Sequence, residues 1–186
     1  GITAANCTCS VWEGFTETMK AMAQWKLWFE EFKTMIMPIY TTKDIFQAQK
    51  EKKVGIILGW QNTTGFGDHL PYVRIFREIG LRIVQLTYNT ANSVGSGCYE
   101  STDGGLTDFG RELVHELNHQ GILIDLSHVG QKTARDTILY SKKPVTYSHC
   151  CPFSLRKHPR NKTDEDLKLI AEHGGVIGIT MFPPFL

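Results

Sequence analysis

Short apolar runs rich in β-branched residues alternate with amphipathic helical segments along the whole chain, and this alternation restricts the fold most. Strands separated by helices pair in parallel through right-handed crossovers, so the pattern predicts an α/β fold. We predict strands at six runs: residues 2–7, 54–60, 81–88, 122–127, 144–148 and 176–180.

The helical segments carry recognisable start and stop signals. Apolar residues at a spacing of three to four predict a long helix between Trp12 and Ile36, which Pro38 should end. Thr41 and Asp44 match a capping box that opens a second helix. Residues 89–105 are rich in Gly, Ser, Asn and Thr, and a loop of this length is usually functional. Further helices are predicted over residues 68–79, 108–120, 131–141 and 164–173, with Thr107 and Thr163 as the N-caps of the second and the last.

Two closures of such a sheet are possible, a doubly wound sheet or a barrel. The strand at residues 54–60 is not followed by the G-x-G-x-x-G fingerprint of a dinucleotide-binding sheet. A complete (β/α)8 barrel typically needs about 250 residues, and this chain has 186. We therefore predict a single domain, residues 1–186, that forms part of a (β/α)8 TIM barrel with about six of the eight strands.

The charge balance and the cysteine content exclude several classes of protein. Twenty basic against 19 acidic residues give a net charge of +1, which argues against a nucleic-acid partner or an anionic membrane surface. No apolar run is long enough to cross a bilayer, and residues 1–10 lack the features of a signal peptide. Five cysteines without a C-x-x-C pattern are best interpreted as free thiols in a reducing, cytoplasmic compartment.

Two of the predicted strands end on the same dipeptide, Ser-His. His128 and His149 would therefore lie at similar heights at the carboxyl ends of neighbouring strands, where functional groups of α/β folds collect. By the strand period of two, His128 shares a face with Leu126, and two neutral imidazoles so placed begin a zinc site. The alternative is that each histidine is an ordinary hydrogen-bonded loop residue. Asp125 lies on the opposite face and is interpreted as a buried hydrogen-bond anchor.

Other polar residues follow the strand ends. Gln61 ends the strand at residues 54–60, and Tyr88 ends the strand at residues 81–88, so both would line the same mouth. Each could equally be a loop or rim residue. Residues 156–162 form a basic loop that is solvated in one interpretation. In the other, one arginine bends inward and clamps a carboxylate with two hydrogen bonds.

Four motifs together resemble the membrane (renal-type) dipeptidase family: residues 105–118, 121–129, 144–149 and 158–161. The resemblance runs from about the strand at residues 54–60 to the C-terminus, and the Trp12 helix is similar to that of bacterial members. Members of this family are barrels with a two-zinc centre. They hydrolyse dipeptides, including some with a C-terminal D-residue, and some open β-lactam rings.

The resemblance implies roles for particular residues. His128 and His149 match the two histidine ligands of the second zinc, and Arg160 matches the arginine that binds the substrate carboxylate. Gln61 falls at the position of the bridging glutamate, and Tyr88 at that of a substrate-contacting histidine. The family's His-x-Asp ligands would lie upstream of these residues. Its catalytic aspartate would lie beyond Leu186, so no catalytic residue is assigned within the chain.

These departures change the expected chemistry. The amide oxygen of Gln61 is neutral and bridges two cations poorly, so we expect one zinc ion or none, and little hydrolysis by these residues alone. Three hypotheses stay open: a zinc-dependent dipeptidase, an amidohydrolase-like enzyme acting on another small amide, and a non-catalytic barrel that binds a carboxylate through Arg160. A homodimer is one possible assembly.

Overall fold

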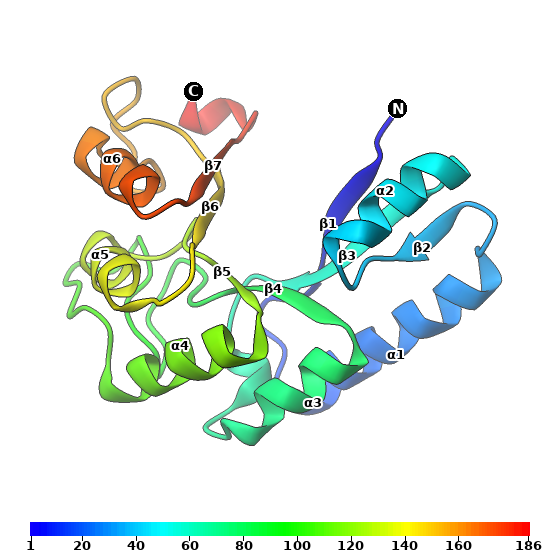
Figure 1. Ribbon diagram of the computed structural model, residues 1–186. Helices are drawn as coiled ribbons and strands as arrows, with labels where there is room; N and C mark the ends of the chain where they lie inside the picture. The colour runs from blue at the N-terminus through cyan, green and yellow to red at the C-terminus, as the bar shows by residue number, and fades with distance from the viewer. The chain divides into compact units, whose positions relative to one another are not determined.

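The computed structural model describes residues 1–186, and the chain falls into two compact units, residues 1–84 and 85–186. Every pairing between the strands within each unit is parallel, and helices follow the strands along the chain (Figure 1). The architecture is α/β and corresponds to part of a (β/α)8 barrel, as the alternation predicts. Whether the two units form one domain stays a prediction.

The N-terminal unit is built around β3 (Val54–Trp60). β1 (Ala4–Ser10) pairs along one edge of it. The opposite edge is shared, because β2 (Ile36–Pro38) pairs with the first half of β3 and β4 (Leu81–Gln85) pairs with the second half. The helices of this unit are α1 (Phe15–Glu31), α2 (Thr42–Glu51) and α3 (Pro71–Ile79), with a 3-10 turn, η1, at Thr64–Phe66.

Aromatic side chains form much of the core of this unit. The ring centroid of Trp60, at the end of β3, lies 4.4 Å from that of Phe76 and 4.6 Å from that of Phe66. Both phenylalanines are fully buried, and Phe15 adds an edge contact to Phe76 at 5.5 Å. These rings join β3, η1, α1 and α3, so burial of their apolar surface stabilises the unit.

The C-terminal unit places β6 (Thr146–Cys150) between β5 (Leu123–Asp125) and β7 (Val176–Ile179). Its helices are α4 (Asp108–Gln120), α5 (Gln131–Tyr140) and α6 (Asp164–Glu172), and a 3-10 turn, η2, follows at Pro183–Phe185. The predicted caps are present: Thr107 Oγ accepts from Gly110 N at 2.9 Å, and Thr163 Oγ accepts from Asp166 N at 3.3 Å.

The structure corrects the long helix predicted between Trp12 and Ile36. α1 ends at Glu31, and Ile36–Pro38 forms β2, a seventh strand that the prediction of six omitted. The apolar spacing continues through this segment, but pairing with β3 places Ile36 opposite Val54. Tertiary pairing therefore outweighs the helical periodicity here, and Pro38 is the last residue of a strand rather than a helix breaker.

Several other boundaries shift by a few residues. α3 begins at Pro71 instead of residue 68, because proline suits the first turn of a helix and the residues between η1 and Pro71 form turns. β4 and β5 are shorter than the runs that predicted them. The five cysteines are free thiols, as predicted. None of the helices combines the length and apolar character that spanning a bilayer requires.

Candidate metal centre

His128 and His149 converge in the C-terminal unit, although by different routes. His149 lies within β6, as predicted, whereas His128 lies three residues beyond the end of β5. A turn in which Val129 N donates to Leu126 O at 3.1 Å carries His128 there, so the prediction that it shares a strand face with Leu126 is wrong. The two Nε2 atoms nevertheless face each other at 3.0 Å. The sequence therefore predicted that the two histidines lie together, but not the backbone conformation at His128.

The partner of His128 Nδ1 is the side chain of Asn89, whose Oδ1 lies at 2.6 Å. An amide oxygen can only accept, so His128 carries its proton on Nδ1 and leaves the Nε2 lone pair free. Asn89 adopts a positive φ of 63°, a conformation that asparagine tolerates better than most residues. The backbone at Asn89 therefore presents the oxygen that selects the tautomer of His128.

A longer hydrogen-bond chain selects the same tautomer of His149. Ser148 Oγ donates to Asp125 Oδ2 at 2.5 Å, so the hydroxyl oxygen accepts from His149 Nδ1 at 2.7 Å. Asp125 also accepts from the backbone N–H groups of Ser127 and Ser148, at 3.1 and 3.0 Å. Asp125 is 3% exposed, which confirms that it is a buried hydrogen-bond anchor.

Two Nε2 lone pairs thus point at one another, and neither ring has a proton to share there. Two imidazoles on one tetrahedral zinc ion, each about 2.05 Å from it, have nitrogens about 3.3 Å apart, close to the separation observed. Burial, followed by the charge of Arg160, lowers the pKa of His128 to about 2. Burial also lowers the pKa of His149, so both imidazoles are neutral and available as ligands. The pair fits two of the ligands of a zinc ion.

A third ligand is not grouped with the pair. The chain contains no cluster of three or more His, Cys, Asp or Glu side chains that could hold a metal ion. Structural and catalytic zinc sites normally have three or four protein ligands. The two histidines alone would therefore supply only part of a coordination shell.

Arg160 is the arginine of the basic loop that turns inward, and it is 1% exposed. It donates from Nη1 to the backbone carbonyl of Ser127 and from Nη2 to that of His149 at 3.3 Å. The guanidinium therefore fixes the backbone beside both histidines. Its Nε has no hydrogen-bond partner and is buried. A group that donates five hydrogen bonds retains capacity for a further acceptor.

Tyr88 stacks on His128, with ring centroids 4.1 Å apart and planes inclined by 22°. The stacked phenol ring therefore limits rotation of the imidazole. Gln61 follows β3 in the N-terminal unit, where its backbone N–H donates to Ser10 O at 2.9 Å. Its assignment as a bridging ligand, like the assignment of Arg160 and Tyr88 to the substrate, stays a prediction.

The catalytic aspartate that the resemblance implies is not assigned to any residue of this chain, because its expected position lies beyond Leu186. Leu186 itself is an apolar residue that follows η2, where its backbone N–H donates to Pro183 O at 3.2 Å. Its side chain is 52% exposed and carries no group that could transfer a proton. The position of the aspartate beyond Leu186 therefore stays a prediction, and the catalytic residue stays unassigned.

Asn89 and Ser148 are the residues of the candidate site that the sequence-based prediction missed. Ser148 could have been found, because a serine precedes each histidine and a hydroxyl oxygen beside an imidazole can accept a hydrogen bond from its N–H group. Asn89 gave a weaker signal, since it is one of several polar residues that begin the long loop.

Comparison with known proteins gives a consistent family assignment. The family described as membrane dipeptidase (peptidase family M19) matches residues 3–186. An uncharacterized dipeptidase from Schizosaccharomyces pombe is 31% identical over 138 residues, which are 72% of this chain and 33% of that protein.

Two solved structures are similar over most of the chain. The crystal structure of an amidohydrolase from Pseudomonas aeruginosa is 53% identical with a TM-score of 0.97, covering 99% of this chain and 56% of that one. A metallo peptidase from Rhodobacter sphaeroides, with a bound phosphinate mimic of the dipeptide L-Ala-D-Ala, is 26% identical with a TM-score of 0.86, covering 92% of this chain and 51% of that one.

The chain spans about half of these solved chains and a third of the yeast protein. The family match nevertheless extends over nearly all of its residues. The chain belongs to the membrane dipeptidase family, peptidase family M19.

Proposed function

We propose that the protein is a zinc-dependent dipeptidase, or the part of one that supplies two ligands of a zinc ion. The observation that carries this proposal is the 3.0 Å approach of His128 Nε2 and His149 Nε2, with both Nδ1 atoms occupied by acceptors. Neutral imidazoles whose second nitrogen is fixed by a hydrogen bond are typical zinc ligands. Family membership makes a peptide bond the expected substrate.

A zinc ion held by these two imidazoles would polarise a carbonyl oxygen and lower the pKa of a bound water. Residues around the pair would hold the two imidazoles in the orientation and tautomer that bind the ion. Asp125, through Ser148, keeps His149 in the ligating tautomer, and Asn89 does the same for His128. Tyr88 holds the ring of His128 in place by stacking.

Arg160 is the proposed partner of the carboxylate at the C-terminal end of a dipeptide. It is a buried cation with an unpartnered Nε, in contact with the backbone of His149. Burial lowers its pKa, but an arginine stays charged at neutral pH. Tolerance of a D-residue at that end is proposed from the relative whose ligand mimics L-Ala-D-Ala.

A second candidate is an amidohydrolase that acts on another small amide. Gln61 and Tyr88 favour it, because a neutral amide and a phenol stand where the resemblance expects a glutamate and a histidine. The similar Pseudomonas aeruginosa structure is described as an amidohydrolase. This candidate shares the metal pair with the first and differs in the substrate.

Zinc affinity, measured by competition with a chromophoric chelator, tests the metal site. We expect the protein to bind one zinc ion, and His149→Gln to weaken binding by about 100-fold or more, since a ligand is lost. His115→Gln is the matched control, because His115 is exposed on α4 and should leave binding unchanged. Unchanged affinity in His149→Gln would contradict the proposal.

Hydrolysis of L-Ala-L-Ala, L-Ala-D-Ala and a small non-peptide amide then separates the two candidates. We expect weak turnover of the dipeptides, because Gln61 is a poor bridge and only two ligands are grouped. Gln61→Glu should raise the zinc stoichiometry and the turnover together. Preference for the non-peptide amide would favour the second candidate.

A further inference from the structure

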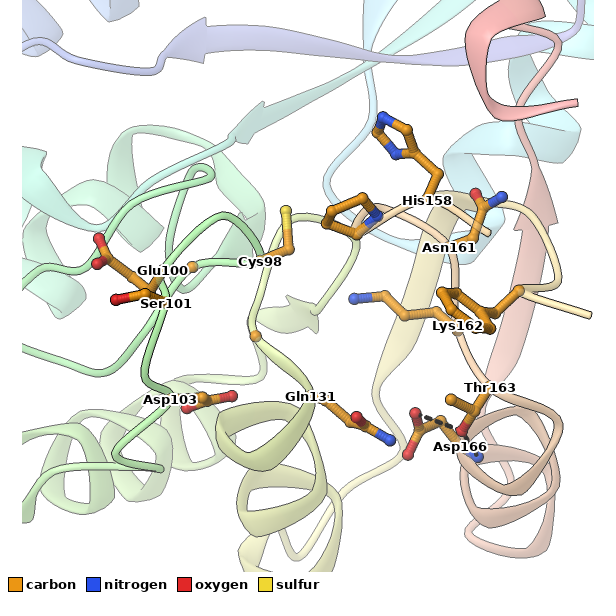
Figure 2. A pocket seen from close by; sticks show the side chains of 14 residues that line it. Cys98, Glu100, Ser101, Asp103, Gln131, His158, Asn161, Lys162, Thr163 and Asp166 are labelled. Carbon is orange, nitrogen blue, oxygen red and sulfur yellow. Dashed lines mark hydrogen bonds between the residues drawn. The ribbon is translucent and has the colours of Figure 1, made fainter. Parts of the chain in front are cut away.

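A cavity of about 430 Å³ lies in the C-terminal unit, apart from the histidine pair. The segment at residues 97–103, the start of α5 and the loop at residues 153–163 enclose it (Figure 2). His128, His149 and Arg160 do not line it. Its volume is within the range of pockets that hold small molecules.

The most unusual group in the wall is the amine of Lys162, which is 3% exposed. Its Nζ donates to Val129 O at 2.8 Å and lies 5.0 Å from the centroid of the Tyr147 ring. Figure 2 shows the amine pointing into the space between Cys98 and Gln131. Lys162 forms no salt bridge, so an ammonium with three donors has one protein acceptor.

The carboxylates of Asp103 and Asp166, which also line the cavity, already have partners. Asp103 accepts from Lys132 N at 2.7 Å and from Thr133 Oγ at 2.6 Å. Asp166 accepts from Arg135 Nε and from Thr163 Oγ. Glu100, the third carboxylate of the wall, is exposed and accepts from Ala91 N at 2.7 Å. Of the two charged groups of the wall that are buried, Asp166 is paired with Arg135, whereas Lys162 forms no ion pair.

The ends of two helices add to this positive potential. Gly130 is the N-cap of α5 and Thr163 is the N-cap of α6, and both residues line the cavity. The positive ends of both helix dipoles thus face it. A dianion would, however, lie beside the carboxylates of Glu100, Asp103 and Asp166. A single negative charge suits these surroundings best.

The rest of the wall includes apolar surface. Phe153, Pro159 and the ring of His158 line the cavity on the side of the basic loop. A ligand with a short apolar body could bury its carbon atoms there. We propose that this cavity binds a small aliphatic monocarboxylate, whose carboxylate accepts hydrogen bonds from Lys162. The site is independent of the proposed peptide hydrolysis, because it uses none of the residues assigned to that function.

Titration with isobutyrate, followed by NMR of the lysine side-chain amines at pH 6.5, tests the proposal on the unmodified protein. We expect the Nζ signal of Lys162 to shift and saturate, with isobutylamine producing no such shift. Inorganic sulfate, which is a dianion at this pH, should bind more weakly than isobutyrate, because of its second charge. Absence of a saturable shift, or tighter binding of sulfate or isobutylamine, would overturn the proposal.

Two variants locate the binding. Calorimetry should give about a 10- to 100-fold weaker affinity for isobutyrate in Lys162→Met, as expected for loss of a charged hydrogen bond. Lys157→Met removes an exposed lysine of the same loop that does not line the cavity, and it should bind as the unmodified protein does. Equal affinity in Lys162→Met would exclude this cavity. If that variant does not fold, the NMR titration still decides the outcome.

Discussion

Replacing Asp125 with asparagine should change which nitrogen of His149 carries the proton. In the protein, the Ser148 hydroxyl donates to Asp125 Oδ2 at 2.5 Å, so its oxygen accepts from His149 Nδ1. In Asp125→Asn, the amide oxygen replaces Oδ1, which serves the backbone N–H groups of Ser127 and Ser148. The amide nitrogen then lies at Oδ2 and donates to Ser148. The Ser148 hydroxyl then donates to His149 Nδ1, so the imidazole proton is carried on Nε2.

These contacts also determine how far the stability and the zinc affinity should fall. Asp125 Oδ1 also accepts from Ser127 Oγ at 2.6 Å, so the carboxylate receives four hydrogen bonds. The substitution keeps the shape but removes the charge, and we expect the free energy of unfolding to fall by about 2 to 3 kcal/mol. The Nε2 of His149 must lose its proton before it can bind zinc. Zinc affinity should therefore fall by about 10- to 100-fold, as for other partners of ligating histidines.

Nitrogen-15 NMR of the imidazole rings in metal-free protein reads the tautomer directly, since the lowered pKa values of both rings keep them neutral near pH 7.5. Asp103→Asn is the matched control, because Asp103 also accepts four hydrogen bonds but does not contact His149. Asp103→Asn should lower the free energy of unfolding by a similar amount and leave the tautomer of His149 unchanged. A proton that stays on Nδ1 of His149 in Asp125→Asn would refute this account of the hydrogen-bond chain.

Three further predictions concern other parts of the chain. Burial lowers the pKa of Lys162 from 10.5 to about 8, so between these pH values the unfolded chain binds more protons than the folded one. The difference in free energy of unfolding between the unmodified protein and Lys162→Met should therefore be level below pH 8 and rise in favour of the unmodified protein by about 3 kcal/mol towards pH 10.5. Urea unfolding at each pH measures this difference. Asn89→Gly tolerates the positive φ but removes the acceptor of His128 Nδ1, so chelator competition should show about 10- to 100-fold weaker zinc binding. Asn89→Asp keeps an acceptor oxygen and should retain the zinc affinity. Phe76→Ala should lower the free energy of unfolding by about 3 to 5 kcal/mol, whereas Phe46→Ala, on a side chain that is 71% exposed, should change it by less than about 0.5 kcal/mol.

Features that depend on residues close in sequence were the easiest to predict. The capping residues Thr41, Thr107 and Thr163 begin helices as predicted, because a cap needs a partner only three positions away. β2 was missed because its stability comes from pairing with β3, which follows α2 in the chain, and the local periodicity around Ile36 cannot reveal that pairing. Sequence patterns thus predicted elements better than their pairings.

The same difference in range applies to the candidate site. His128 and His149 were predicted from matched Ser-His endings, and the inward turn of Arg160 was one of two interpretations of the basic loop. The role of Asn89 depends on a contact across 39 positions and on a positive φ, and neither leaves a distinctive mark in the sequence. Candidate ligands can therefore be predicted from residue type and position, whereas the residues that orient them need the structure.

The charge around the histidine pair makes Asp125 more important here than it would be in a site with a bridging glutamate. Both imidazoles are neutral, and Arg160 adds positive potential beside them. Asp125 Oδ2 lies 3.9 Å from His149 Nδ1 and is the negative charge connected to the pair through hydrogen bonds. If Gln61 occupies the bridging position that the family resemblance assigns to it, Gln61→Glu would supply a second negative charge to the metal. The loss of zinc affinity caused by Asp125→Asn should then be several-fold smaller in the Gln61→Glu protein than in the unmodified one. Equal losses in the two backgrounds would show that Gln61 does not share the metal with His128 and His149.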